Sequence, residues 1–183
     1  MTSSSLAAGA EWVKGIGFLI LLASASAAQG EVKSATPAGF EVERKVRVSA
    51  TPAETYAALG RIGDWWNDSH TYSGDAANMI LELKVEGCFC ETIPKGDGRI
   101  EHGRVIYAQP GETLRLQGGL GPLQAEAAIG ILTWSLKPVE GGTEITQTYV
   151  AGGYVRGGAE RLAPVVDQVL GQQLDGLRDH LAR

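Results

Sequence analysis

Two cysteines and a histidine are the residues whose types and spacing could support covalent or metal chemistry. Cys88 and Cys90 lie one residue apart in a stretch that alternates like a strand, so both side chains are expected on the same face. If residues 94–98 form the hairpin loop that follows, Cys90 lies opposite His102 on the next strand. This register would bring a thiol and an imidazole together.

Four interpretations of the two thiols are open. An imidazole beside Cys90 could lower the pKa of its thiol and make it a nucleophile, or both thiols could hold zinc with His102. The thiols could instead pack as small apolar groups. A disulfide would require local distortion of the strand, because Cα atoms two apart lie at about 6.5–7 Å. No metal is expected, since zinc ligands usually have wider spacing and no fourth ligand is evident.

A second group of candidates is a histidine and several large aromatic side chains. His70 shares a polar loop with Asp64 and Asp75, where it could act as a general base or be simply solvated. Aromatic side chains commonly line pockets for apolar ligands, and they also fill cores. The aromatic candidates for a pocket are Trp65, Trp66, Trp134, Tyr107 and Tyr149.

These side chains must be positioned by strands and two helices. Residues 40–48 alternate between apolar and charged and predict a strand, and Thr51, Pro52 and Glu54 predict a helix start with a capping box. Leucine and valine recur at helical spacing from Leu162 to Leu181, which predicts a long amphipathic helix. Further strands are predicted over residues 79–85, 88–93, 100–108, 113–118, 127–137 and 143–151.

The N-terminus has the pattern of a cleavable signal peptide. Lys14 precedes an apolar run over residues 15–23, and small residues follow through Ala28, so cleavage is predicted near Ala28. Residues 29–38 are expected to be a flexible leader. The chain is therefore expected to be periplasmic or secreted, without a stable transmembrane segment after cleavage. The alternative is an uncleaved anchor, because Glu11 nearly cancels the positive charge of Lys14.

Length and charge narrow the functional classes. The chain has 183 residues, so removal of residues 1–28 leaves room for one domain with a substantial core. The net charge is -5 and no cluster of Lys or Arg occurs, which argues against nucleic-acid binding. The sequence contains neither a Gly-x-Ser-x-Gly elbow nor a His-Glu-x-x-His motif, so hydrolase and metalloprotease functions lose their usual support.

The order strand, short helix, six strands, long helix predicts an α+β fold. A curved antiparallel sheet can bury its concave face by wrapping around the final helix, which gives a helix-grip architecture. Space is easily left between a curved sheet and a straight helix. An apolar internal cavity of this kind would suit a small ligand.

Several short motifs, taken in order, resemble the SRPBCC superfamily (START, polyketide cyclase and Bet v 1-like proteins). The motifs are Asp64-Trp65-Trp66, residues 70–78, Gly87-Cys88-Phe89-Cys90-Glu91, residues 101–105, residues 116–124 and Thr133-Trp134. The resemblance covers residues 39–183, and within the superfamily it is to exported, uncharacterised members with the Gly-Cys-Phe-Cys-Glu signature. It implies a deep hydrophobic cavity between the sheet and the C-terminal helix, and it supplies no universal catalytic residue.

The expected function is therefore binding of a small hydrophobic or amphipathic molecule, such as a lipid, outside the cytoplasm, with no cofactor. The alternative is an enzyme resembling polyketide cyclases, in which His102, His70 or Tyr107 moves a proton. A third possibility is docking on a protein partner. The residues expected to line the ligand site are Trp65, Trp66, His70, Cys90, His102, Tyr107, Trp134, Tyr149, Val166, Val169 and Leu170.

Overall fold

The computed structural model describes Met1 and residues 29–183, so nearly all of the predicted signal peptide lies outside the described residues. The described chain forms eight strands and two α-helices, joined by short 3-10 turns. The helices are α1 (Pro52–Leu59) and α2 (Ala163–Leu181). The strands are β1 (Gln29–Thr36), β2 (Gly39–Val48), β3 (Met79–Leu81), β4 (Cys88–Ile93), β5 (Gly98–Gln109), β6 (Thr113–Gln117), β7 (Ala127–Val139) and β8 (Gly142–Tyr154).

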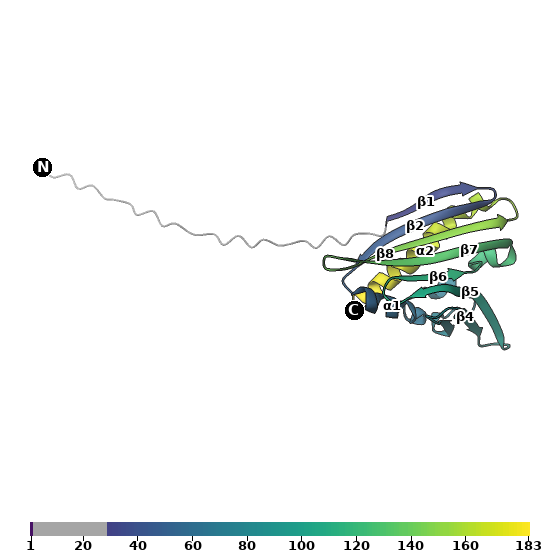
Figure 1. Ribbon diagram of the computed structural model, residues 1–183, viewed down its shortest axis with the longest axis horizontal. Coiled ribbons are helices and arrows are strands. Elements are labelled where there is room, and N and C mark those ends of the chain that lie inside the picture. The colour runs from purple at the N-terminus through teal and green to yellow at the C-terminus, as the bar shows by residue number, and fades with distance from the viewer. Residues whose placement is uncertain (2–28) are drawn as a thin grey trace.

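The eight strands form one curved antiparallel sheet against which α2 packs. The strand order is β1-β2-β8-β7-β6-β5-β4-β3, so consecutive strands from β3 to β8 are neighbours and β2 closes against β8. Figure 1 shows α2 running along one face of the sheet, with contacts to β1 and β2. The sheet and the C-terminal helix confirm the predicted α+β fold with a helix-grip-like arrangement. Within residues 29–183, no helix combines the length and apolar character that a membrane-spanning segment needs.

The start of α1 is the capping box that the sequence predicts. The Thr51 hydroxyl accepts a hydrogen bond from the Glu54 backbone N–H at 3.3 Å, and the Glu54 carboxylate accepts one from the Thr51 backbone N–H at 2.8 Å. Pro52 occupies the first turn, where a missing N–H costs no helical hydrogen bond. The helix therefore begins where its local sequence dictates.

Strand β1 corrects the expectation of a flexible leader over residues 29–38. Its backbone pairs with β2, with Val32 opposite Val42 and Thr36 opposite Gly39. Val32 also packs against the core. The pairing orders the segment because a neighbouring strand satisfies its backbone hydrogen bonds, which local composition does not reveal.

Strand β3 is shorter than the predicted strand over residues 79–85. The chain turns after Leu81, and Glu86 adopts a left-handed backbone conformation with φ of 65°. The Glu86 N–H donates to the carbonyl of Val105 at 2.8 Å, so the turn is held against β5. The other predicted strands agree with the structure to within a few residues at each end.

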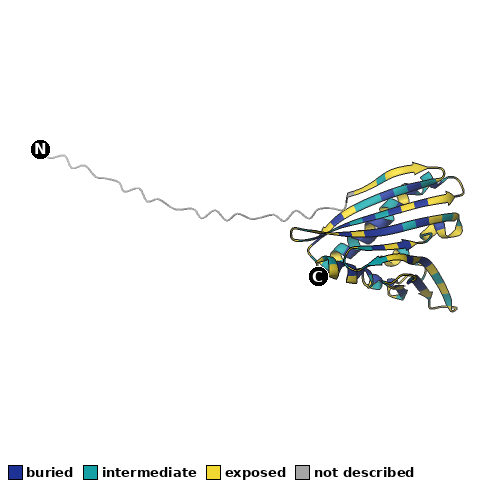
Figure 2. Cartoon of the chain, viewed as in Figure 1, coloured by how far each residue is buried: buried dark blue, intermediate teal, exposed yellow. Residues whose placement is uncertain are grey.

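The core lies between the sheet and α2. Buried and exposed residues alternate along the long strands, as Figure 2 shows, and α2 contributes Val166, Leu170, Leu174 and Leu177 from one face. Two glycines let neighbouring groups approach this helix closely. A Cβ at Gly176 would overlap the Trp65 carbonyl, and one at Gly171 would overlap the Arg44 guanidinium, which pairs with Asp167 of α2 at 2.7 Å.

Candidate functional site

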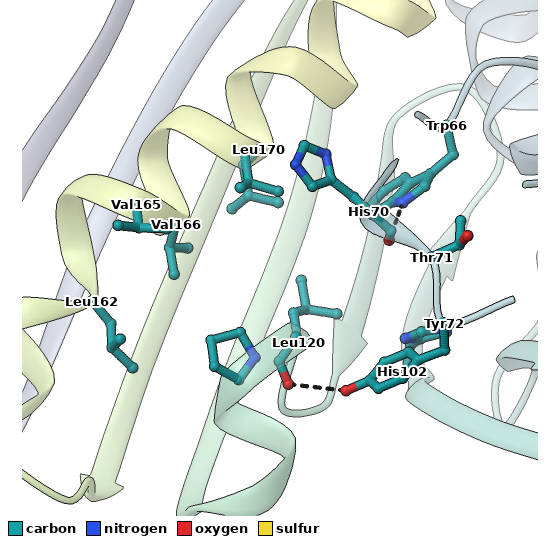
Figure 3. A pocket seen from close by; sticks show the side chains of 13 residues that line it. Trp66, His70, Thr71, Tyr72, His102, Leu120, Leu162, Val165, Val166 and Leu170 are labelled. Atoms are coloured by element: carbon teal, nitrogen blue, oxygen red, sulfur yellow. Dashed lines mark hydrogen bonds between the residues drawn. The ribbon is translucent and has the colours of Figure 1, made fainter. Parts of the chain in front are cut away.

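A cavity of about 310 Å³ lies between α2 and the sheet, beside two loops. Most of the side chains that face it are apolar, and Figure 3 shows them converging from α2, the loop over residues 66–72 and the segment over residues 120–122. Tyr72 and Val165 are largely exposed at its edge, so the cavity opens to solvent there. The lining residues are Trp66, His70, Thr71, Tyr72, His102, Leu120, Gly121, Pro122, Leu162, Val165, Val166, Val169 and Leu170.

The wall formed by the first half of α2 is entirely apolar. Val166, Val169 and Leu170 are spaced three and four residues apart, which places their side chains on one face of the helix. Leu162 extends this face from the residue before the helix. The same periodicity that predicted the helix therefore also builds this wall.

The opposite wall is a loop held in place by aromatic packing and hydrogen bonds. The Trp66 ring packs against Phe89 of β4, with ring centroids 5.4 Å apart, and the Trp66 indole N–H donates to the His70 carbonyl at 3.1 Å. The Asn67 backbone N–H donates to the Gln173 side-chain carbonyl on α2 at 2.8 Å. These contacts fix the loop to both the sheet and the helix.

The third wall, over residues 120–122, is anchored by Tyr149. Its hydroxyl donates to the Gly118 carbonyl at 3.2 Å and accepts from the Leu120 backbone N–H at 3.2 Å. Burial raises the pKa of Tyr149 to about 12, so the hydroxyl keeps its proton at neutral pH. The Tyr72 hydroxyl at the cavity edge donates to the Gly121 carbonyl at 3.3 Å, which joins this wall to the loop over residues 66–72.

One polar constellation faces the cavity from the sheet. His102 of β5 is 5% exposed, Glu91 of β4 is 1% exposed, and their Nε2 and carboxylate oxygen lie 2.9 Å apart. Glu91 also accepts hydrogen bonds from the backbone N–H groups of Tyr72, at 3.1 Å, and of Ser73. The His102 ring lies 4.8 Å from the Phe89 ring.

The surroundings of Glu91 and His102 set their protonation states at neutral pH. Burial tends to raise the pKa of Glu91, but hydrogen bonds from Ser73, Tyr72 and His102 outweigh it and hold that pKa below its ordinary value. Burial lowers the pKa of His102, and the opposing attraction of Glu91 does not fully offset it. The pair is therefore a carboxylate beside a neutral imidazole.

A second histidine lies on the loop side of the same cavity. His70 Nδ1 is 2.7 Å from the side-chain amide nitrogen of Gln173, and Gln173 is fully buried. His70 therefore does not stand free in solvent, and it is tied to α2. The cavity is apolar apart from a few side-chain groups, which are those of His70, His102, Thr71 and Tyr72.

Six of the eleven predicted ligand residues line this cavity, and five do not. Those that line it are Trp66, His70, His102, Val166, Val169 and Leu170. Trp65, Trp134 and Tyr149 are buried core residues instead, because large aromatic side chains fill the space between sheet and helix. The Trp65 indole N–H donates to the Ala58 carbonyl at 2.9 Å, which ties it to α1.

Tyr107 is placed outside the cavity by a β-bulge. In the pairing of β5 with β6, Val105 lies opposite Leu116 and Tyr107 lies opposite Arg115, so Ile106 is the extra residue. The bulge interrupts the inward and outward alternation. Tyr107 is 43% exposed on the outer face, where the Arg115 guanidinium carbon lies 5.7 Å from its ring centroid.

A second bulge separates Cys90 from the cavity and from His102. Phe89 pairs with Gly103 and Cys90 pairs with Glu101, so His102 is the extra residue of β5. The predicted register, with Cys90 opposite His102, is therefore wrong. His102 lies beside the buried Phe89, whereas Cys90 points to the opposite face of β4, where its side chain is buried beside Glu101.

Cys88 and Cys90 form a disulfide, one of the four alternatives left open by the sequence. Their Cα atoms are 5.4 Å apart, so the strand is locally compressed, as a disulfide at this spacing requires. The two sulfurs and a Glu101 carboxylate oxygen lie within 4.8 Å of one another, a cluster that could ligate a thiophilic metal only with both thiols reduced. Bonded to each other, the sulfurs are neither thiolate ligands nor nucleophiles.

Sequence reasoning missed Glu91 and the wall over residues 120–122. Glu91 is an acidic residue two positions after Phe89 in a predicted strand, so both side chains are expected on the same inward face. A charged residue at such a position is rare unless it is paired, and this was the available signal for a polar site. Residues 120–122 combine Leu, Gly and Pro in a loop, and no periodic pattern distinguishes such a segment as part of a cavity. Tyr72 was likewise indistinguishable from a surface tyrosine.

Comparisons with known proteins show the fold and nothing finer. No family model matches the sequence, and no curated protein matches it. Solved structures do match, among them the protein MLL2253 of Mesorhizobium loti, with 18% identity, a TM-score of 0.58, and 78% of this chain and 97% of that chain covered. An uncharacterised protein of Rhizobium leguminosarum matches with 17% identity and a TM-score of 0.57, covering 86% of this chain and 99% of that chain.

CalU16 of Micromonospora echinospora matches with 14% identity and a TM-score of 0.56, covering 84% of each chain. Similarity at this level of identity establishes a shared architecture only. It does not establish a shared function, because one fold hosts many unrelated functions. The resemblance to the SRPBCC superfamily is compatible with this shared fold but remains a prediction.

Proposed function

We propose that the chain binds a small hydrophobic or amphipathic molecule in the cavity between α2 and the sheet. The observation that carries this proposal is the apolar lining of a space of about 310 Å³, which opens to solvent beside Tyr72 and Val165. Each 100 Å² of apolar ligand surface removed from water contributes about 2.5 kcal/mol, so a ligand that fills the space gains most of its affinity from burial.

Filling the cavity with protein atoms tests this proposal. Val169→Trp places an indole in the cavity, and we expect the affinity for an apolar fluorescent dye to fall at least about tenfold. Gln168→Trp is the matched control, because Gln168 is exposed on the same helix. Native mass spectrometry of freshly purified protein should detect a bound small molecule. Equal dye affinity in both variants and the parent, or no dye binding by the parent, would contradict the proposal.

A second candidate is an enzyme that moves a proton on the bound molecule, as in the polyketide cyclases that the sequence resembles. The observation that favours it is the buried Glu91 carboxylate behind His102 at 2.9 Å, an arrangement that orients an imidazole as a general base. Replacing His102 with Ala should then abolish turnover of any ligand identified in the cavity. Retained turnover would exclude His102 as the base.

We also propose that the chain is an exported member of the SRPBCC superfamily, with residues 1–28 as a signal peptide. The support is the sequence pattern of the N-terminus together with the helix-grip-like fold. Expression of the full chain in a bacterium, followed by mass spectrometry of the periplasmic fraction, should find a new N-terminus near Ala28. Protein that stays in the cytoplasm at full length would refute this.

A further inference from the structure

Two of the polar side chains that line the cavity are imidazoles, and their ring protons are assigned by their hydrogen-bond partners. The partner of His102 is a carboxylate, and the partner of His70 is an amide. The carboxylate can only accept, and the amide is oriented by a hydrogen bond from the Asn67 backbone N–H so that its nitrogen faces His70, which leaves each histidine with one defined hydrogen-bonding atom. The chemistry of the ligand follows from these atoms.

His102 presents a lone pair. The Glu91 carboxylate can only accept hydrogen bonds, and it already accepts from two backbone N–H groups, so the proton of neutral His102 lies on Nε2. Nδ1 is then an acceptor, and no group within residues 29–183 is paired with it. In the described chain, the side-chain polar atoms that are fully buried and lack a partner belong to Thr55, Tyr56 and Glu160. Nδ1 of His102 is not one of them, so this unpaired atom is in contact with the cavity that His102 lines.

His70 presents a donor. The Asn67 backbone N–H donates to Oε1 of Gln173, which fixes the orientation of that amide and leaves its nitrogen to donate to Nδ1 of His70. Nδ1 of His70 is therefore an acceptor, and the ring proton lies on Nε2. No partner of this Nε2 is found in the described chain, so it remains available to a ligand.

The charge distribution favours an uncharged ligand. Among the described lining residues none is Lys or Arg, and the charge nearest to His102 is the Glu91 carboxylate behind it. An anionic head group beside His102 would face a lone pair and a buried negative charge without a compensating cation. Burying a charge without a partner is costly in an apolar environment.

We propose that the ligand of this cavity carries a neutral hydroxyl group, as an alcohol or a phenol, which donates to Nδ1 of His102. An oxygen atom of the same ligand can accept from Nε2 of His70. This inference rests on the proposed binding function and specifies its ligand class. It disfavours fatty acids and phospholipids, because their head groups carry a charged carboxylate or phosphate.

Three probes with one apolar body separate the ligand classes: para-hexylphenol, para-hexylbenzoate and hexylbenzene. Their affinities can be measured at neutral pH by displacement of an apolar dye, with the phenol neutral and the benzoate ionised. We expect the phenol to bind about threefold to tenfold more tightly than hexylbenzene, the effect of one net hydrogen bond. The benzoate should bind at least about tenfold more weakly than the phenol.

Glu91→Gln removes the charge behind His102 and offers an amide N–H to its ring. The preference for phenol over benzoate should then fall to about threefold or less, judged as the ratio of the two affinities in each variant. Glu140→Gln makes the same change on an exposed turn and should retain the parent preference. If Glu91→Gln does not fold, ¹⁵N chemical shifts of His102 in the parent protein report the ring proton directly.

The outcomes separate the two proposals. If none of the probes binds, the proposed binding function fails and this inference fails with it. If hexylbenzene binds but the phenol is no better, or the benzoate binds best, binding stands and the assignment of a neutral hydroxyl is overturned. A proton found on Nδ1 of His102 would also overturn it.

Discussion

Tyr149→Phe tests whether one buried hydroxyl supports both stability and the cavity wall. The hydroxyl bridges the Gly118 carbonyl and the Leu120 N–H, each at 3.2 Å, and Tyr149 is fully buried. The Gly118 carbonyl keeps a second partner, the Gly130 N–H at 3.1 Å, but no other partner of the Leu120 N–H is found in the described chain. The substitution therefore leaves one backbone donor unsatisfied.

An unsatisfied buried donor costs about 1–3 kcal/mol. Since Leu120 is only partly buried, we expect the free energy of unfolding to fall by about 1–2 kcal/mol, toward the lower end of that range. This corresponds to a decrease in Tm of roughly 2–8 °C for a chain of this size. Because Leu120 lines the cavity, the affinity for an apolar dye should fall as well.

Urea denaturation measures the change, with the midpoint and the slope recorded for each variant. Tyr107→Phe is the matched control, because it removes the same atom from an exposed tyrosine whose hydroxyl contacts Gln109. This control should change the free energy of unfolding by less than about 0.5 kcal/mol. If both variants unfold at the same urea concentration, the Tyr149 hydroxyl does not anchor the wall and the reasoning is refuted.

Three other substitutions or conditions test separate parts of the structure. Gly130→Ala would place a Cβ against the same hydroxyl and should lower both stability and dye affinity; unchanged affinity in a folded variant would contradict the anchoring role. Replacing Cys88 and Cys90 with Ser should cost about 1–2 kcal/mol in urea denaturation and leave dye affinity within about twofold, since the disulfide faces away from the cavity. The pKa of His102 lies below its ordinary 6.5 and that of Glu91 below 4.5, so the unfolded chain binds more protons in acid. Stability should therefore decrease as the pH falls below 6.5 and decrease further below 4.5, and a rise in the urea midpoint over this range would refute the assigned shifts.

Most of the fold could be predicted because its signals are local. The apolar spacing of α2, the capping box at Thr51 and the turn residues between strands each act within a few residues. Strand β1 is different, because its order depends on pairing with β2. A segment whose structure comes from a neighbouring strand carries a weak signal in its own composition.

Aromatic content was a poor guide to the cavity for a physical reason. Trp134 and Tyr149 bury large surfaces, and a side chain that fills space between sheet and helix removes a cavity rather than lining one. The space remains where smaller side chains face each other. Val166, Val169 and Pro122 lie along such a gap.

The contact between His102 and Glu91 depends on a β-bulge that no local sequence pattern predicts. A regular pairing of β4 with β5 would place His102 opposite Cys90 on one face, but the extra residue in β5 is His102 itself. One inserted residue interrupts the alternation of side chains between the two faces of the strand. The bulge therefore lets His102 face the cavity and meet Glu91, while Cys90 stays with Glu101 on the outer face. The same inserted residue explains why the thiol and imidazole predicted as partners belong to separate sites.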